Sequence, residues 1–204
     1  MSVITCRSNQ LRRTRDLCLK EPAEAFYSYV GGSSGAWTVT ELTSRRGRLL
    51  EPVTHVDIIQ GPPTRLPQGA SWILSGIVRQ TRYVSLEETL TGNRFGRSTN
   101  QEPTCAALIP ILHSAEWWEL GDATRQQMVG MNSRAATRGL SSLSAMIYRW
   151  QHGQDLSKQF DSVTWFEYEP RDSNAFEELL RDLRGSVEWK YVDRECDIRL
   201  VRSR

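Results

Sequence analysis

The side chains that could carry chemistry are few, and their spacing argues against two common kinds of site. The only histidines are His55, His113 and His152, and none forms a recognisable metal-ligand motif with a neighbouring histidine, cysteine or carboxylate. The stretch Gly31-Gly32-Ser33-Ser34-Gly35 has neither the spacing of a dinucleotide-binding fingerprint nor the lysine of a phosphate loop. The sequence therefore predicts neither a metal centre nor a nucleotide site.

Tryptophan is the residue type that stands out, with seven in 204 residues. Indole rings fill protein cores, but they also line flat or aromatic ligand sites. Core burial explains most of the seven, because tryptophan is highly buried on average. We expect the pair Trp117-Trp118 to be the exception, because adjacent residues of a strand point to opposite faces and one ring would then face a cavity.

Charge divides the chain into a basic extension and a nearly neutral domain. Residues 1–20 carry five basic side chains against Asp16 alone, whereas the whole chain has a net charge of only +2. We therefore predict a flexible basic extension over 1–24 and a single domain over 25–204. A nearly neutral domain argues against a nucleic-acid partner, and no apolar run approaches the roughly 20 residues that cross a membrane. Four scattered cysteines without a C-x-x-C pair favour the reducing cytoplasm.

Hydrophobic patterning predicts the elements that must position these side chains. Strands are expected at 25–30, 37–42, 106–111, 163–168 and 189–201, and helices at 124–138, at 140–151 and over the stripe Phe176, Leu179, Leu180 and Leu183. In the last strand, Val192, Cys196, Ile198 and Leu200 form one apolar face and alternate with polar residues. The strand–helix–strand order of the second half is a split βαβ unit, and the first half is a looser version of it. We therefore predict a ferredoxin-like α+β fold.

Several spaced motifs in the second half agree with one known family. They are 113–120 (HSAEWWEL), 160–168 (FDSVTWFEY), 176–179 (FEEL) with Leu183-Arg184, and 188–200 (EWKYVDRECDIRL). With Gly35-Ala36-Trp37 and parts of 72–84, they resemble the chlorite dismutase family, in particular its short, dimeric subgroup. The resemblance implies a homodimeric α+β barrel whose C-terminal ferredoxin-like half holds heme b, and the decomposition of chlorite to chloride and dioxygen.

The chain departs from this family at positions close to the iron. The resemblance places the histidine that binds the iron at Ala135, and residues 131–138 contain no histidine. The distal arginine of the family falls on Tyr148, which precedes Arg149, and a family lysine is replaced by His113. Glu167 matches the carboxylate that hydrogen-bonds the iron-binding histidine. Because alanine has no lone pair for iron, decomposition of chlorite by the family mechanism is not expected.

The same departures suggest new roles for the remaining polar groups. Glu167 without an imidazole partner would pair with Arg134 or Arg138, which lie one helical turn apart. Tyr148 could bind heme iron as a phenolate that Arg149 helps to ionise, and it could equally fill the space of the lost arginine. His113 is a weaker candidate ligand, since its family counterpart lies at the pocket rim.

Three hypotheses follow for the function. The first, which we favour, is a heme-free protein that reuses the pocket for another small molecule and performs oxidative or acid–base chemistry with Glu167 and Tyr148 as proton carriers. Its pocket would be lined by Trp117, Trp118, Trp165, Arg134 and Arg149. The second is a heme-dependent oxidoreductase with Tyr148 as an unusual ligand, and the third is a non-catalytic dimeric binding protein. The cofactor is left open, with heme b as the candidate.

Overall fold

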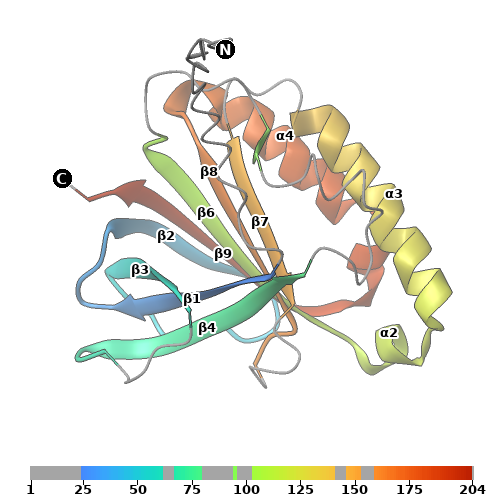
Figure 1. Ribbon diagram of the computed structural model, residues 1–204, viewed down its shortest axis with the longest axis horizontal. Coiled ribbons are helices and arrows are strands. Elements are labelled where there is room, and N and C mark those ends of the chain that lie inside the picture. The colour runs from blue at the N-terminus through green and yellow to red at the C-terminus, as the bar shows by residue number, and fades with distance from the viewer. Residues whose placement is uncertain are drawn as a thin grey trace, which may run out of the picture.

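The computed structural model describes residues 24–61, 67–79, 94–95, 103–140, 146–152 and 159–203 (Figure 1), with backbone alone at 24–25, 78–79, 94–95, 132–140 and 146–152. The strands are β1 Glu24–Gly32, β2 Trp37–Arg46, β3 His55–Gln60, β4 Ala70–Arg79, β5 Arg94–Phe95, β6 Cys105–His113, β7 Met146–His152, β8 Ser162–Tyr168 and β9 Val192–Arg202. The helices are α2 Ala115–Glu119, α3 Asp122–Leu140, α4 Ser173–Arg184 and the 3-10 turns η1 Pro170–Asp172 and η2 Glu188–Tyr191. None of the described helices is long and apolar enough to cross a membrane.

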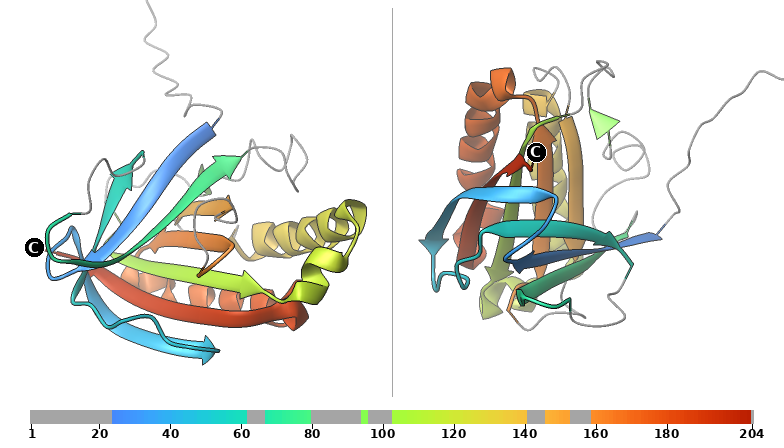
Figure 2. Two further views of the ribbon diagram at one scale, coloured as in Figure 1. Left: turned by 90° about the horizontal axis from the view of Figure 1, so that it is seen from below. Right: turned by 90° about the vertical axis from the view of Figure 1, so that its left-hand side faces the viewer.

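The strands form one antiparallel sheet in the order β4-β1-β3-β2-β9-β6-β8-β7-β5. Ile77 in β4, the first strand of this order, also pairs with His152 in β7, the last strand but one, so the sheet closes into a barrel. One half of the barrel is β1 to β4, and the other is β6 to β9 with the helices α3 and α4 along its outside (Figures 1 and 2). This is the predicted ferredoxin-like α+β fold.

Alternating side chains of the central strand β6 feed two hydrophobic cores, because successive residues of a strand point to opposite faces. Ala106 and Leu108 face the barrel interior, where they join residues of both halves. Ala107, Ile109 and Ile111 face the other way, toward α4. Both faces of the strand are therefore buried, as the continuous apolar run predicted.

Helix α4 is amphipathic and covers the outer face of the second half. Its buried residues Phe176, Leu179 and Leu180 pack against that face, as their helical spacing predicted. Tyr168 of β8 stacks on Phe176 with ring centroids 4.2 Å apart. The sheet and α4 therefore share one tightly packed core, which fixes the position of β8 beneath the helix.

The polar face of β9 lies beneath α4 rather than in solvent. Glu195 and Asp197 are each 1% exposed, and the Arg184 guanidinium at the end of α4 bonds both carboxylates at 2.6 and 2.7 Å. Arg199 adds a second guanidinium on Asp197. Burial alone would raise the pKa of Asp197, but the hydrogen bonds and charges of the two arginines outweigh burial and lower this pKa.

The structure corrects two elements that the sequence suggested. Residues 146–152 form the strand β7 and not part of a helix, because this segment pairs along its full length with β8. Trp117 and Trp118 lie on the short helix α2 and not on a strand. Neighbouring residues of a helix are about 100° apart, so Trp117 is buried while Trp118 is only half-buried beside it.

Candidate functional site

Glu167 is a buried carboxylate that faces the barrel interior. It lies two residues after Trp165 on β8, so both side chains are on the same face of the strand. The Trp165 Nε1–H donates to Glu167 Oε1 at 2.8 Å, and Arg202 Nη2 lies 3.7 Å from Glu167 Oε2. The guanidinium of Arg202 also lies over the Trp37 ring, 4.7 Å from its centroid. A tryptophan and an arginine therefore hold this carboxylate.

Trp165 is held in place by other aromatic rings and in turn positions Glu167. It is fully buried, stacks on Tyr29 at a centroid distance of 5.4 Å and meets Trp37 edge-on at 5.3 Å. Such packing restricts the indole to one orientation, so its N–H points at a fixed place in the interior.

His113 is clamped between two buried carboxylates where β6 ends. Its Nδ1 lies 2.9 Å from Asp161 Oδ1, and its Nε2 lies 3.3 Å from Glu188 Oε1. The His113 backbone N–H donates to the second Asp161 oxygen at 2.9 Å. The imidazole also stacks on Trp117 with ring centroids 4.5 Å apart and an angle of 14° between the planes.

These contacts decide the charge of His113. Burial lowers the pKa of an imidazole, but the hydrogen bonds and charges of Asp161 and Glu188 outweigh burial and raise the pKa of His113 to about 9. The ring is therefore a cation at neutral pH, and both of its nitrogens carry hydrogens that point at carboxylates. An imidazolium has no lone pair to give to a metal, so in this arrangement His113 is not a ligand.

Arg125 of α3 is a further positioning residue, and the sequence gave no signal for it. Its Nη1 donates to the carbonyl oxygens of Trp118 and Leu120 at 2.9 and 2.7 Å, and it also forms an ion pair with Asp122. Its guanidinium lies 5.2 Å from the centroid of the Trp118 ring. Arg125 therefore satisfies the carbonyl groups at the end of α2 and fixes both tryptophans relative to α3.

The predicted site residues fall into two separate groups. Ile111 pairs with Ser162 at one end of the β6–β8 ladder, and Cys105 pairs with Tyr168 at the other. The His113 group lies at the first end and Glu167 near the second, six residues along from Asp161, which corresponds to about 20 Å of strand. The structure therefore joins His113 to Trp117 and Trp118, and it joins Trp165 to Glu167, but it keeps the two groups apart.

The backbone register places the β7 positions on both faces of the sheet. Arg149 lies opposite Trp165, and Tyr148 lies opposite Phe166, which packs against α4. Directly paired residues share a face, so position 149 belongs to the interior face of Glu167 and position 148 to the outer face. Arg134 and Arg138 lie with Ala135 on α3, which runs beside α4.

Comparison with solved structures identifies the family. The chain is 36% identical to the dimeric chlorite dismutases from Nitrobacter winogradskyi, with a TM-score of 0.72, and the match covers 87% of this chain and 99% of that one. The chain belongs to the chlorite dismutase family. Mutant chlorite dismutase from Candidatus Nitrospira defluvii shares the fold at 17% identity, with a TM-score of 0.61 and coverage of 91% and 94%. The chain matches no protein-family sequence model and no curated protein sequence.

The sequence of helix α3 does not supply the iron-binding histidine that the family resemblance implies. Helix α3, where the resemblance puts the iron ligand, has alanine at position 135 and no histidine, cysteine or tyrosine along its 19 residues. This chlorite dismutase homologue therefore has the fold of its family and no histidine on α3.

Proposed function

We propose that this protein is a homodimeric member of the chlorite dismutase family that binds a small molecule in its C-terminal half without an iron-ligated heme. It does not decompose chlorite, and it uses Glu167 for acid–base chemistry on another substrate. The observation that carries the proposal is the state of His113, whose two ring nitrogens are both bonded to carboxylates. The family resemblance adds that Ala135 stands where the iron ligand is expected.

Glu167 is suited to proton transfer because its orientation is fixed. Oε1 accepts the Trp165 N–H at 2.8 Å, and Oε2 faces the half-exposed Arg202. A carboxylate held in this way presents one oxygen at a constant place, and general acid–base catalysis depends first on such geometry. The neighbouring guanidinium compensates the negative charge when the carboxylate is ionised.

Position 149 is the β7 position that would assist this carboxylate. It is opposite Trp165 in the register, on the interior face, whereas position 148 is on the outer face. We therefore assign the assisting role to Arg149 rather than to Tyr148. An arginine there would orient an anionic group of the substrate toward Glu167.

The decisive experiment is a titration of the purified protein with hemin, followed by gel filtration. We expect no stoichiometric Soret band to co-elute with the protein, and no dioxygen release when chlorite is added. A chlorite dismutase from Candidatus Nitrospira defluvii is described in complex with imidazole. Hemin that is taken up only when imidazole is added would show that the ligand has been lost while the pocket remains.

A stoichiometric Soret band without imidazole would contradict the proposal. Tyr148→Phe would then identify the ligand, with Tyr191→Phe as the control, since Tyr191 packs against Trp117 at the other group. Loss of the band in the first variant alone would assign a phenolate ligand to Tyr148.

The second half of the proposal is tested without heme. A thermal-shift screen of small organic acids and bases is run on the wild-type protein and on Glu167→Gln, whose amide oxygen can still accept the Trp165 N–H. A compound that stabilises only the wild-type protein would support a role for the Glu167 charge. The homodimer is tested by light scattering, which should give twice the 23.3 kDa mass of one chain.

A further inference from the structure

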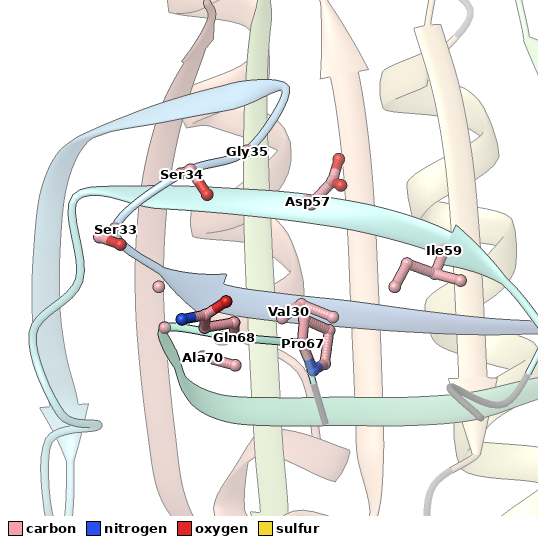
Figure 3. A pocket seen from close by; sticks show the side chains of 11 residues that line it. Val30, Ser33, Ser34, Gly35, Asp57, Ile59, Pro67, Gln68 and Ala70 are labelled. Carbon is pink, nitrogen blue, oxygen red and sulfur yellow. The ribbon is translucent and has the colours of Figure 1, made fainter. Parts of the chain in front are cut away.

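A second site candidate lies in the other half of the barrel, outside the region discussed above. A hollow of about 190 Å³ opens where β1 turns into β2 and where the chain enters β4 (Figure 3). The residues that line it are Val30, Gly32, Ser33, Ser34, Gly35, Asp57, Ile59, Pro67, Gln68, Gly69 and Ala70. We refer to it as the β1–β4 hollow.

Close backbone contacts make this hollow rigid. A Cβ on Gly32 would lie 2.5 Å from the Gly69 carbonyl oxygen, and one on Gly35 would lie 2.6 Å from the backbone of Val56. Only glycine permits such approaches, so the two loops are locked against each other and against β3. Ser203 adds a tether from the C-terminal strand, with its hydroxyl donating to the Gly35 carbonyl at 3.1 Å. A preformed site of this kind loses little entropy when it binds a ligand.

The spacing of the loop also matches a nucleophile elbow, G-x-S-x-G, with Ser33 at its centre. A nucleophile elbow joins a strand to a helix and presents the serine to a histidine. This loop joins two strands, and no histidine lines the hollow. Its serines are therefore suited to binding rather than to hydrolysis.

The lining determines the charge of the ligand. Among the described residues that line the hollow, Asp57 is the only charged side chain. Within the described part of the chain, its one hydrogen bond is a long contact of 3.4 Å from the Ala36 N–H. Ser33, Ser34 and Gln68 add neutral hydrogen-bonding groups. The electrostatic complement of this lining is a cation with hydrogen-bond donors.

The size of the hollow and its apolar wall narrow the class of ligand further. Val30, Ile59, Pro67 and Ala70 form an apolar wall, which favours a ligand with a short hydrocarbon part. A volume of about 190 Å³ is that of about six liquid waters, at about 30 Å³ each. We propose that the β1–β4 hollow binds a small primary amine as its ammonium ion, with the charge on Asp57 and the hydrocarbon against Val30 and Ile59.

The test is a titration of the full-length protein at neutral pH, followed by the amide NMR signals of Ser33, Ser34 and Gln68. The probes are butylamine, 1-butanol and butyrate, which share a chain length and differ in charge. We expect butylamine to shift these signals with a Kd in the millimolar range, which is about 4 kcal/mol of binding free energy. Equal shifts from 1-butanol or butyrate, or no shift with butylamine, would overturn the proposal.

Variants make the result specific. Asp57→Asn should weaken butylamine binding at least tenfold, whereas Asp182→Asn on the exposed face of α4 should leave it unchanged. Ala70→Leu places a larger side chain in the hollow and should abolish binding while the carboxylate is kept. Circular dichroism confirms that each variant is folded. Binding that survives both Asp57→Asn and Ala70→Leu would refute the assignment.

Discussion

The clamped imidazolium of His113 should make the stability of the protein depend on pH in a defined window. The pKa of His113 is about 9 in the folded protein, against 6.5 for a free imidazole. A group whose pKa is higher in the folded than in the unfolded protein stabilises the folded state. This stabilisation is complete when the pH is below the pKa of the unfolded state, and it is lost as the pH rises through the pKa of the folded state. The window is therefore pH 6.5 to 9.

The size of the effect follows from the same two values. One pKa unit corresponds to about 1.4 kcal/mol, so the rise from 6.5 to about 9 corresponds to about 3 kcal/mol of unfolding free energy. The side chain is only 5% exposed, so solvent screening reduces this figure little. Replacement of the ring leaves Asp161 and Glu188 buried without their cation, which costs a similar amount, about 3 kcal/mol or more.

The assay is urea unfolding between pH 6 and pH 9.5, followed by tryptophan fluorescence at one fixed protein concentration. We expect the unfolding free energy of the wild-type protein to fall by about 3 kcal/mol across this range. His113→Gln should be less stable at pH 6 and should lose most of the pH dependence. His55→Gln is the matched control, because His55 is half-exposed and its ring bonds only the neighbouring Thr54 hydroxyl among the described contacts.

Two results would refute this reasoning. One is a pH dependence of the same slope in His113→Gln and in the wild-type protein. The other is an NMR titration in which the imidazole of His113 loses its proton below pH 6.5. Asp161→Asn provides an independent check, because it removes one of the two carboxylates and should move the window to lower pH without removing the ring.

Three further substitutions test the framework around the candidate sites. Arg184→Met removes a guanidinium from two buried carboxylates of β9 and should lower the free energy of unfolding, measured in urea, by about 3 kcal/mol. The control is Arg181→Met at an exposed position, which should change this free energy by less than about 0.5 kcal/mol. Arg46→Ala removes two hydrogen bonds to carbonyl groups of η2 and β9 and should lower the free energy of unfolding by about 1 kcal/mol in the same assay. The control is Arg45→Ala, because the Arg45 side chain makes a longer and weaker contact, with Asp197. Trp165→Phe removes the N–H donor to the interior carboxylate and should lower the melting temperature by several degrees.

The strongly periodic elements were predictable from the sequence. The apolar run 106–111 and the strand 163–168 lie within a residue or two of β6 and β8, and the stripe from Phe176 to Leu183 lies on α4. In each case the spacing of the apolar residues identifies the type of element, because it matches the period of a strand or of a helix. The family motifs lie on these same elements, so the fold followed from both sources.

The strand β7 was missed because its local composition is ambiguous. Met146, Gln151 and the arginine between them are compatible with a helix, and single residues such as Ile147 favour a strand only weakly. Pairing with β8 decides the matter, and that pairing joins residues of a second segment that a local pattern cannot identify. The same limit placed Trp117 and Trp118 on a strand when Ser114 in fact precedes a helix.

The partners of the polar side chains were the least predictable part of the site. His113 meets Asp161 and Glu188 across 48 and 75 residues of sequence, and no spacing rule connects them. Local helical spacing suggested Arg134 and Arg138 as partners of Glu167, and their side chains lie outside the described residues, whereas the contacts of Glu167 to Trp165 and Arg202 had no local signal. Ion pairs between distant strands depend on the sheet order, which becomes known only with the fold.

The family resemblance implies substitutions at positions 113 and 135, and the number of hydrogen-bond donors at position 113 connects the two. A lysine has three donors at the end of a flexible chain, whereas an imidazolium has two in a fixed ring. Both donors of His113 are used within the protein, by Asp161 and Glu188, and its face is covered by Trp117. Position 113 has kept a positive charge but has no donor left for a bound anionic group. The proposed function needs no such donor, so the state of His113 and the alanine at position 135 are both compatible with the proposal of a C-terminal half without iron-ligated heme.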